Sequence, residues 1–214
     1  MKKIIIILTS IFVSYANISI AQEEKDSREK LVLGAKAGVN VSNVYDEKGQ
    51  DFTANPKAGF AGGVFLGIPI GKYLGVQPEV LFSQKGYQST GTMLGSSYSD
   101  TRTTSYLDIP LQIQFKPISM LTFLGGVQYS YLLHQQDLYV FGANSVAQDQ
   151  QFKNDNARKN IFGAVFGIDA NIDHFIVSGK ACWDLQNNVG DGSSYTPRYK
   201  NIWFQLTVGF RLYR

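Results

Sequence analysis

Residues 105–116, SYLDIPLQIQFK, alternate apolar and polar side chains over their whole length. One face carries large apolar side chains: Leu107, Ile109, Leu111, Ile113 and Phe115. The other face carries Tyr106, Asp108, Gln112, Gln114 and Lys116. Because successive side chains of a β-strand point to opposite sides, this run predicts a strand with one oily face.

The same two-faced pattern recurs along the chain, in segments long enough to cross a bilayer as tilted strands. It predicts about eight strands, near residues 33–42, 57–68, 73–87, 105–116, 120–134, 160–171, 174–186 and 199–213. Pro78 and Pro110 fall inside two of them and lack a backbone donor, so we expect local bulges or missing ladder hydrogen bonds there.

Connections between these strands alternate strictly between short and long. Residues 69–72, 117–119 and 172–173 are tight, whereas residues 43–56, 88–103, 135–159 and 187–198 are long and polar. This asymmetry is typical of an up-and-down barrel with short periplasmic turns and longer outside loops, and an even strand count returns both termini to the periplasm. The predicted fold class is therefore all-β, a single eight-stranded antiparallel transmembrane β-barrel.

Alternation does not by itself decide which face lies inside, because a soluble barrel that binds a small ligand also alternates. An eight-stranded barrel has room inside only for packed side chains or one small ligand. The apolar faces carry more bulky groups than such a lumen accepts, so the oily face is predicted to look outward. That surface would aggregate in water but suits lipid.

Residues 1–21 resemble an export signal, with Lys2 and Lys3 ahead of an apolar run and a small-x-small end before Gln22. We expect residues 22–31 to be a flexible periplasmic lead-in and residues 32–214 to form the barrel. The formal charge is +3, from 20 basic and 17 acidic residues, and does not favour a nucleic-acid partner. Cys182 is the single cysteine, which excludes an internal disulfide.

The polar faces then define the lumen. Nine charged residues are candidates to point inward and to pair in a plugging network with amides: Lys36, Glu79, Lys85, Asp108, Lys116, Asp169, Lys180, Asp184 and Arg211. Pairing is expected because a buried charge without a partner costs several kcal/mol. Aromatic girdles are predicted near the two membrane interfaces, from Tyr129, Tyr131 and Trp183 at the outer side and Phe115, Phe175 and Phe210 at the inner side.

Three stretches carry a family resemblance: LGAKAGVNVSN with Gly34, Lys36, Gly38 and Asn40, VQPEVLFSQKGY at residues 76–87, and YLDIPLQIQF at residues 106–115. Together they resemble the PorT-like outer-membrane β-barrel family of Bacteroidota. The resemblance implies a barrel in the cell outer membrane. It transfers no active site, because the matching residues are strand residues, and the family is functionally broad: its namesake assists protein secretion.

We therefore expect a structural or binding barrel whose outside loops contact lipopolysaccharide, a host surface or another ligand. The alternative is an accessory of protein secretion or envelope assembly that acts through a protein partner. A solute path or a barrel enzyme is a weaker alternative. His134, near Ser130 and Asp137, and His174 are the two histidines, and neither pattern specifies a catalytic or metal site. No cofactor is expected.

Overall fold

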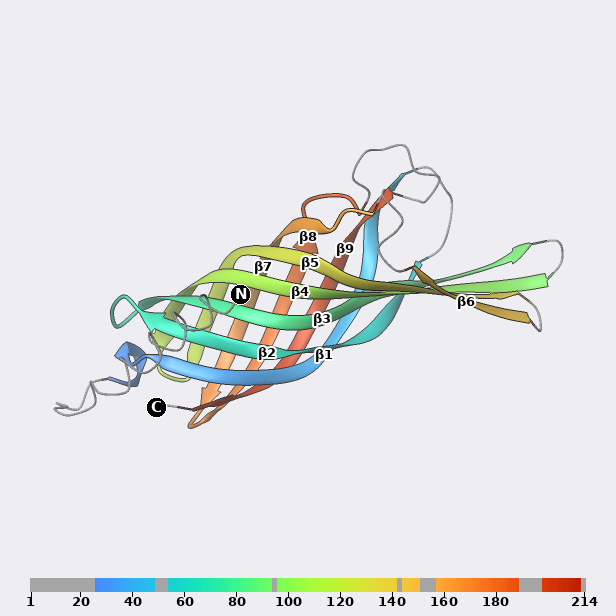
Figure 1. Ribbon diagram of the computed structural model, residues 1–214. Helices are drawn as coiled ribbons and strands as arrows, with labels where there is room; N and C mark the ends of the chain where they lie inside the picture. The colour runs from blue at the N-terminus through green and yellow to red at the C-terminus, as the bar shows by residue number, and fades with distance from the viewer. Residues whose placement is uncertain are drawn as a thin grey trace, which may run out of the picture.

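The computed structural model describes residues 26–48, 54–93, 96–141, 144–150, 157–188 and 198–212. A short 3-10 turn, η1 (Ser27–Glu29), precedes a series of long strands (Figure 1). Among the described residues, no helix has the length and apolar character needed to cross a bilayer. The predicted signal at residues 1–21 and the start of the lead-in lie outside the described residues.

Eight of the strands form a closed antiparallel ring. They are β1 (Val32–Lys48), β2 (Ala54–Pro69), β3 (Leu74–Met93), β4 (Ser96–Ile118), β5 (Leu121–Phe141), β7 (Asn160–Ile172), β8 (Phe175–Asp184) and β9 (Arg198–Arg211). Each pairs with its neighbours along the chain, and β9 pairs back onto β1, for example Leu206 with Val39. The predicted fold class is confirmed.

Side chains alternate between the two sides of the ring wall, as the pleat of a strand requires. The burial pattern of β9 alternates buried and exposed residues almost without interruption. Leu111, Phe166 and Leu206 expose 52%, 58% and 56% of their surface on the outside of the barrel. The oily face therefore looks outward, as predicted.

The predicted strands coincide with the ring strands, and the three tight turns lie where the sequence places them. Strands meet after Pro69, Ile118 and Ile172, all at one end of the barrel, which we call the turn end (Figure 1). Asp173 has φ +47°, a left-handed conformation that the two-residue turn between β7 and β8 requires.

The β3–β4 ladder keeps one register on both sides of the two prolines. It nevertheless has no paired residues between Pro78↔Leu111 and Leu81↔Asp108, the stretch that contains Pro110. The predicted loss of ladder hydrogen bonds at these prolines matches this gap.

At the opposite end, which we call the loop end, strand structure runs further than predicted. Residues 88–103 were expected to form a loop, but β3 continues to Met93 and β4 begins at Ser96. Within the expected loop 135–159, β5 continues to Phe141 and β6 (Asn144–Gln150) pairs back onto it. These expectations are wrong because they rested on the loss of regular alternation in these segments, whereas the backbone of each segment still pairs with its neighbours.

The outer segments form a four-stranded extension, the outer sheet, made of residues 90–93, 96–101, 135–141 and 144–150 in the order β3, β4, β5, β6. Figure 1 shows both hairpins projecting well beyond the ring at the loop end. In the described part of the chain, β6 pairs with β5 and leaves its other edge open.

Candidate functional site

The centre of the lumen is occupied by a charge cluster around Glu79 on β3. Lys180 donates to both carboxylate oxygens at 2.7 and 2.8 Å, and Lys36 donates to Oε1 at 2.9 Å. The amides of Gln77 and Gln112 donate to the same oxygen at 2.7 and 2.9 Å. These side chains come from four strands, β1, β3, β4 and β8, so the cluster ties opposite walls of the barrel together.

A second cluster lies nearer the loop end, around Lys85 on β3. Its ammonium pairs with Asp108 Oδ1 at 3.1 Å and lies 3.3 Å from Ser130 Oγ. It also sits 3.7 Å from the ring centroid of Trp203 and 4.6 Å from that of Tyr106, positions that stabilise a cation by its attraction to the ring face. A buried lysine is thus held by one carboxylate and two aromatic rings.

The other predicted lumen charges also point inward, with partners of different kinds. Asp184 accepts from the Asn201 side chain at 2.6 Å, and Asp169 accepts from Ser178 Oγ at 2.5 Å. Lys116, which is 8% exposed, donates to the backbone carbonyl of Arg28. Arg211 donates to the Asn171 side chain.

Aromatic and polar side chains close the lumen toward the outer sheet. Arg102 forms a two-point ion pair with Asp137, with N–O distances of 2.7 and 3.0 Å. Its guanidinium also contacts the Tyr199 hydroxyl at 3.4 Å, and Tyr199 packs edge-on against Tyr87. Arg102 thus fixes the base of the outer sheet to the ring.

Arg102, Asp137 and Tyr199 were missing from the predicted lumen set. Arg102 lies in the expected loop 88–103 and Asp137 in the expected loop 135–159, where alternation gives no signal. The buried aromatic pair Tyr87 and Tyr199 was the available hint, since two tyrosines on inward positions of predicted strands need polar partners.

The six predicted girdle residues lie on the outer surface and contact other aromatic rings or polar groups there. Trp183 stacks on Phe166 with ring centroids 5.8 Å apart, and Phe115 stacks on Phe123 at 6.4 Å. Phe175 and Phe210 form an edge-on pair at 5.5 Å beside the turn end. Tyr131 is 38% exposed, and Tyr129 packs on Phe162 while its hydroxyl donates to Asn160.

Ser130 and Asp137, which are near His134 in the sequence, contact other residues in the structure. Ser130 is buried beneath Lys85, Asp137 is paired with Arg102, and His134 itself is exposed. His174 stacks on Phe210 at the turn end, and Cys182 is buried in a small cluster with Val165 and Trp203. Among the described residues, no group of three His, Cys, Asp or Glu side chains is placed to hold a metal ion.

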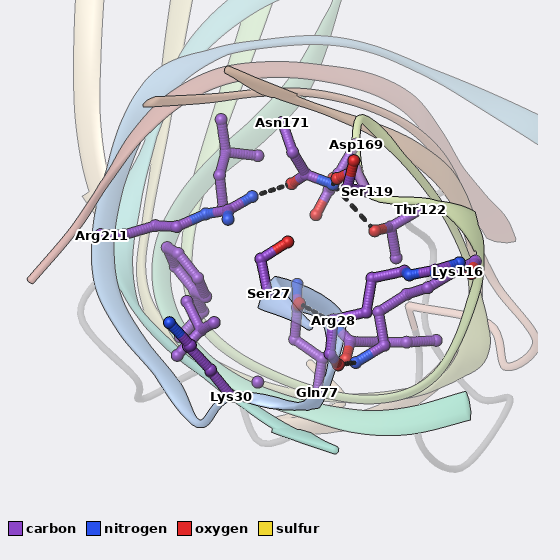
Figure 2. A pocket seen from close by; sticks show the side chains of 15 residues that line it. Ser27, Arg28, Lys30, Gln77, Lys116, Ser119, Thr122, Asp169, Asn171 and Arg211 are labelled. Atoms are coloured by element: carbon purple, nitrogen blue, oxygen red, sulfur yellow. Dashed lines mark hydrogen bonds between the residues drawn. The ribbon is translucent and has the colours of Figure 1, made fainter. Parts of the chain in front are cut away.

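Residues 26–31, which we call the strap, lie in the mouth of the barrel at the turn end (Figure 2). Arg28 donates to the carbonyl of Pro117 at 3.0 Å, pairs with Asp26 at 2.7 Å and packs over the ring of Tyr73. Asp26 also pairs with Lys72 at 3.4 Å, and hydrogen bonds from Arg28 hold the pKa of Asp26 well below its usual range. The sequence alone predicts no contacts for this segment, because a short charged stretch carries no periodicity.

Comparison with known proteins adds a family and a fold. Residues 20–190 match the family model described as "Outer membrane protein beta-barrel domain". Ail, the attachment invasion locus protein of Yersinia pestis, has a similar structure, with a TM-score of 0.50, 14% identity, and 85% of this chain and 98% of that chain covered. This likeness shows the fold alone.

Two further solved barrels are more distant. Neisserial surface protein A has a TM-score of 0.47 and 10% identity, with 86% of this chain and 100% of that chain covered. OprG of Pseudomonas aeruginosa has a TM-score of 0.44 and 12% identity, with 87% and 98% covered. No curated protein matches the chain in sequence.

Proposed function

Because the chain belongs to the outer membrane protein β-barrel domain family, and therefore resides in the outer membrane, we propose that it is a surface-binding barrel. Its lumen is a structural element, and its outer sheet is the binding element. The observation that carries this proposal is the outer sheet itself, which projects past the ring and, among the described residues, ends in the open edge of β6 (Figure 1).

An open strand edge presents a row of backbone N–H and C=O groups that can pair with an added strand. Main-chain hydrogen bonds along such an edge are a recurrent way of binding an extended peptide. The partner we propose is accordingly an extended polypeptide segment outside the cell. Lipopolysaccharide is the lipid that we expect to surround the barrel below the outer sheet.

The filled lumen argues against a solute path as the main function. Ion pairs of Glu79 and Lys85 with side chains of other strands lie in the central part of the barrel, and the residues in them are at most 4% exposed. Opening a path would separate buried charges at a cost of several kcal/mol. We expect planar bilayer recordings of the folded protein to lack stable large open states, and such states would contradict the plugged lumen.

Site-specific photocrosslinking in intact cells tests the binding role. A photoreactive residue at Ala147 on β6 should capture an external polypeptide, whereas the same residue at Gly71, in the first short turn, serves as the matched control. A stoichiometric partner captured from Gly71, with none from Ala147, would instead support the accessory role in secretion or envelope assembly.

Two finer assignments belong to the same proposal. The three motifs at residues 33–43, 76–87 and 106–115 support membership of the PorT-like group. Residues 1–21 are proposed to direct export and to be removed before Gln22, which mass spectrometry of the mature N-terminus tests.

A further inference from the structure

A cavity lies in the mouth of the barrel at the turn end, between the strap and the barrel wall (Figure 2). Its volume is about 40 Å³. One water requires roughly 10–15 Å³ on the same measure, so the cavity has room for about three waters or one small oxyanion. It lies at the end that faces the periplasm, far from the outer sheet, and is independent of the proposed binding role.

Positive charge predominates in the wall of this cavity. Among the residues that the structure describes, four cationic side chains line it, those of Arg28, Lys30, Lys116 and Arg211, together with one carboxylate, that of Asp169. Asp26 offsets part of the charge of Arg28 from outside the cavity. The Asp169 carboxylate accepts from Ser178, so it is already engaged on the wall side. The lining therefore has a surplus of positive charge.

Lys116 is the residue whose environment points most directly to an anion. It is 8% exposed, and its ammonium donates at 2.7 Å to the backbone carbonyl oxygen of Arg28. A backbone carbonyl is a neutral acceptor and does not balance the charge of the ammonium. An ammonium has three N–H donors, so donors remain for a ligand in the cavity. Burying a cation against a neutral acceptor is costly, and an anion beside it would offset that cost.

We propose that this cavity binds a small tetrahedral oxyanion, a phosphate group, between Lys116 and Arg211, with the strap closing over it. Hydrogen bonds from cationic donors to phosphate are short and strong, and the amide of Gln114 and the hydroxyl of Thr122 add neutral donors in the same wall. Because the strap contributes Ser27, Arg28 and Lys30 to the wall, anion binding and docking of the strap stabilise each other.

Two sources could supply this group from the periplasm: free inorganic phosphate and a phosphomonoester. Calorimetric titration of the full-length barrel, folded in detergent at constant ionic strength, distinguishes them. Tighter binding of inorganic phosphate identifies the free ion, and tighter binding of glycerol phosphate identifies a phosphomonoester. Saturable binding of either supports the site, whereas the absence of saturable binding by both overturns it.

Two substitutions with opposite expected effects distinguish a specific phosphate site from nonspecific attraction of an anion to a basic protein. Lys116→Gln should weaken phosphate binding at least about tenfold, the loss typical of a hydrogen bond to a charged group. Asp169→Asn should strengthen it, because the carboxylate in the wall repels the ligand. Lys159→Gln, an exposed lysine at the loop end, should leave affinity unchanged. Equal effects of the two lysine variants would overturn the proposal.

Trypsin provides an independent readout through the strap. Phosphate should slow cleavage after Lys30 in the unmodified protein and should not do so in Lys116→Gln. A gel-mobility comparison of heated and unheated samples shows whether each variant is folded. If Lys116→Gln does not fold, the sign of the Asp169→Asn effect decides: unchanged or weaker binding in that variant counts against the site.

Discussion

At the residue scale, one buried carboxylate in the lumen is the ion-pair partner of two lysines. Glu79 serves two lysines, and both ammonium groups lie within 2.9 Å of its Oε1 atom. Sequence alternation could nominate each of these residues as inward-facing. It could not pair them, since Glu79 and Lys180 are 101 residues apart and come from strands that are not neighbours in the ring.

Glu79→Gln should therefore be strongly destabilising. The substitution leaves Lys36 and Lys180 buried beside each other without the carboxylate that both contact, and breaking a buried pair in this way typically costs about 3–5 kcal/mol. Urea titration of the barrel in lipid vesicles measures the free energy of unfolding.

Lys36→Met is the matched control in the same cluster. It leaves the Glu79–Lys180 pair with both of its hydrogen bonds, at 2.7 and 2.8 Å, so the loss should be only about 1 kcal/mol. Equal losses in the two variants would show that Glu79 does not act as the shared counter-charge.

At the element scale, some glycines lie where a neighbouring strand leaves no room for a Cβ atom. A Cβ atom on Gly38 of β1 would overlap the carbonyl oxygen of Leu206 on β9, and its next contact, with the Thr207 Cα, would be 2.6 Å. A Cβ on Gly179 of β8 would meet no atom within 4 Å. The seam between the first and last strands therefore depends on Gly38.

Gly38→Ala should lower the free energy of unfolding by about 1–3 kcal/mol, the usual cost of forcing extra volume into a packed site. Backbone atoms of β9 cannot rotate away as a flexible side chain could. Gly179→Ala, on β8 next to β9, should leave the free energy of unfolding nearly unchanged in the same urea titration. A Gly38→Ala barrel as stable as Gly179→Ala would contradict the close approach described for this seam.

Prediction from sequence succeeded for elements wherever lipid imposes an oily face. The end of β4 at Ile118 and the start of β7 at Asn160 lie within two residues of their predicted positions. The outer sheet was missed because Ser, Thr and Gln dominate there and no alternation remains. The strap was missed for a related reason: its role comes from contacts of Arg28 with Pro117 and Tyr73, which chain order does not reveal.

At the scale of the whole molecule, the two tryptophans report on opposite sides of the wall. Trp183 stacks on Phe166 on the outer surface, whereas Trp203 is 1% exposed and packs against Lys85 inside. Aromatic residues near the membrane interface are typical anchors, and we place Trp183 in the outer girdle.

Brominated phospholipids should therefore quench the two tryptophans unequally. In vesicles with bromines near the headgroup end of the acyl chain, the Trp203→Phe variant, which retains Trp183, should lose most of its fluorescence. Trp183→Phe, which retains Trp203, should be quenched weakly, because the barrel wall separates that ring from lipid. Similar quenching in both variants would be incompatible with the inside-outside arrangement.

The pairing of β1 with β9 has a consequence for biogenesis. Backbone hydrogen bonds join residues near the two extremes of the barrel sequence, such as Ala35 and Phe210, so the cylinder cannot seal before the entire polypeptide has been delivered. Before closure, the incomplete sheet has two bare margins, the unpaired sides of its first and last strands, and lipid cannot satisfy the backbone N–H and C=O groups there. Insertion must then proceed with those margins shielded, and shortening the chain by one strand at either extremity should yield a sheet that never seals.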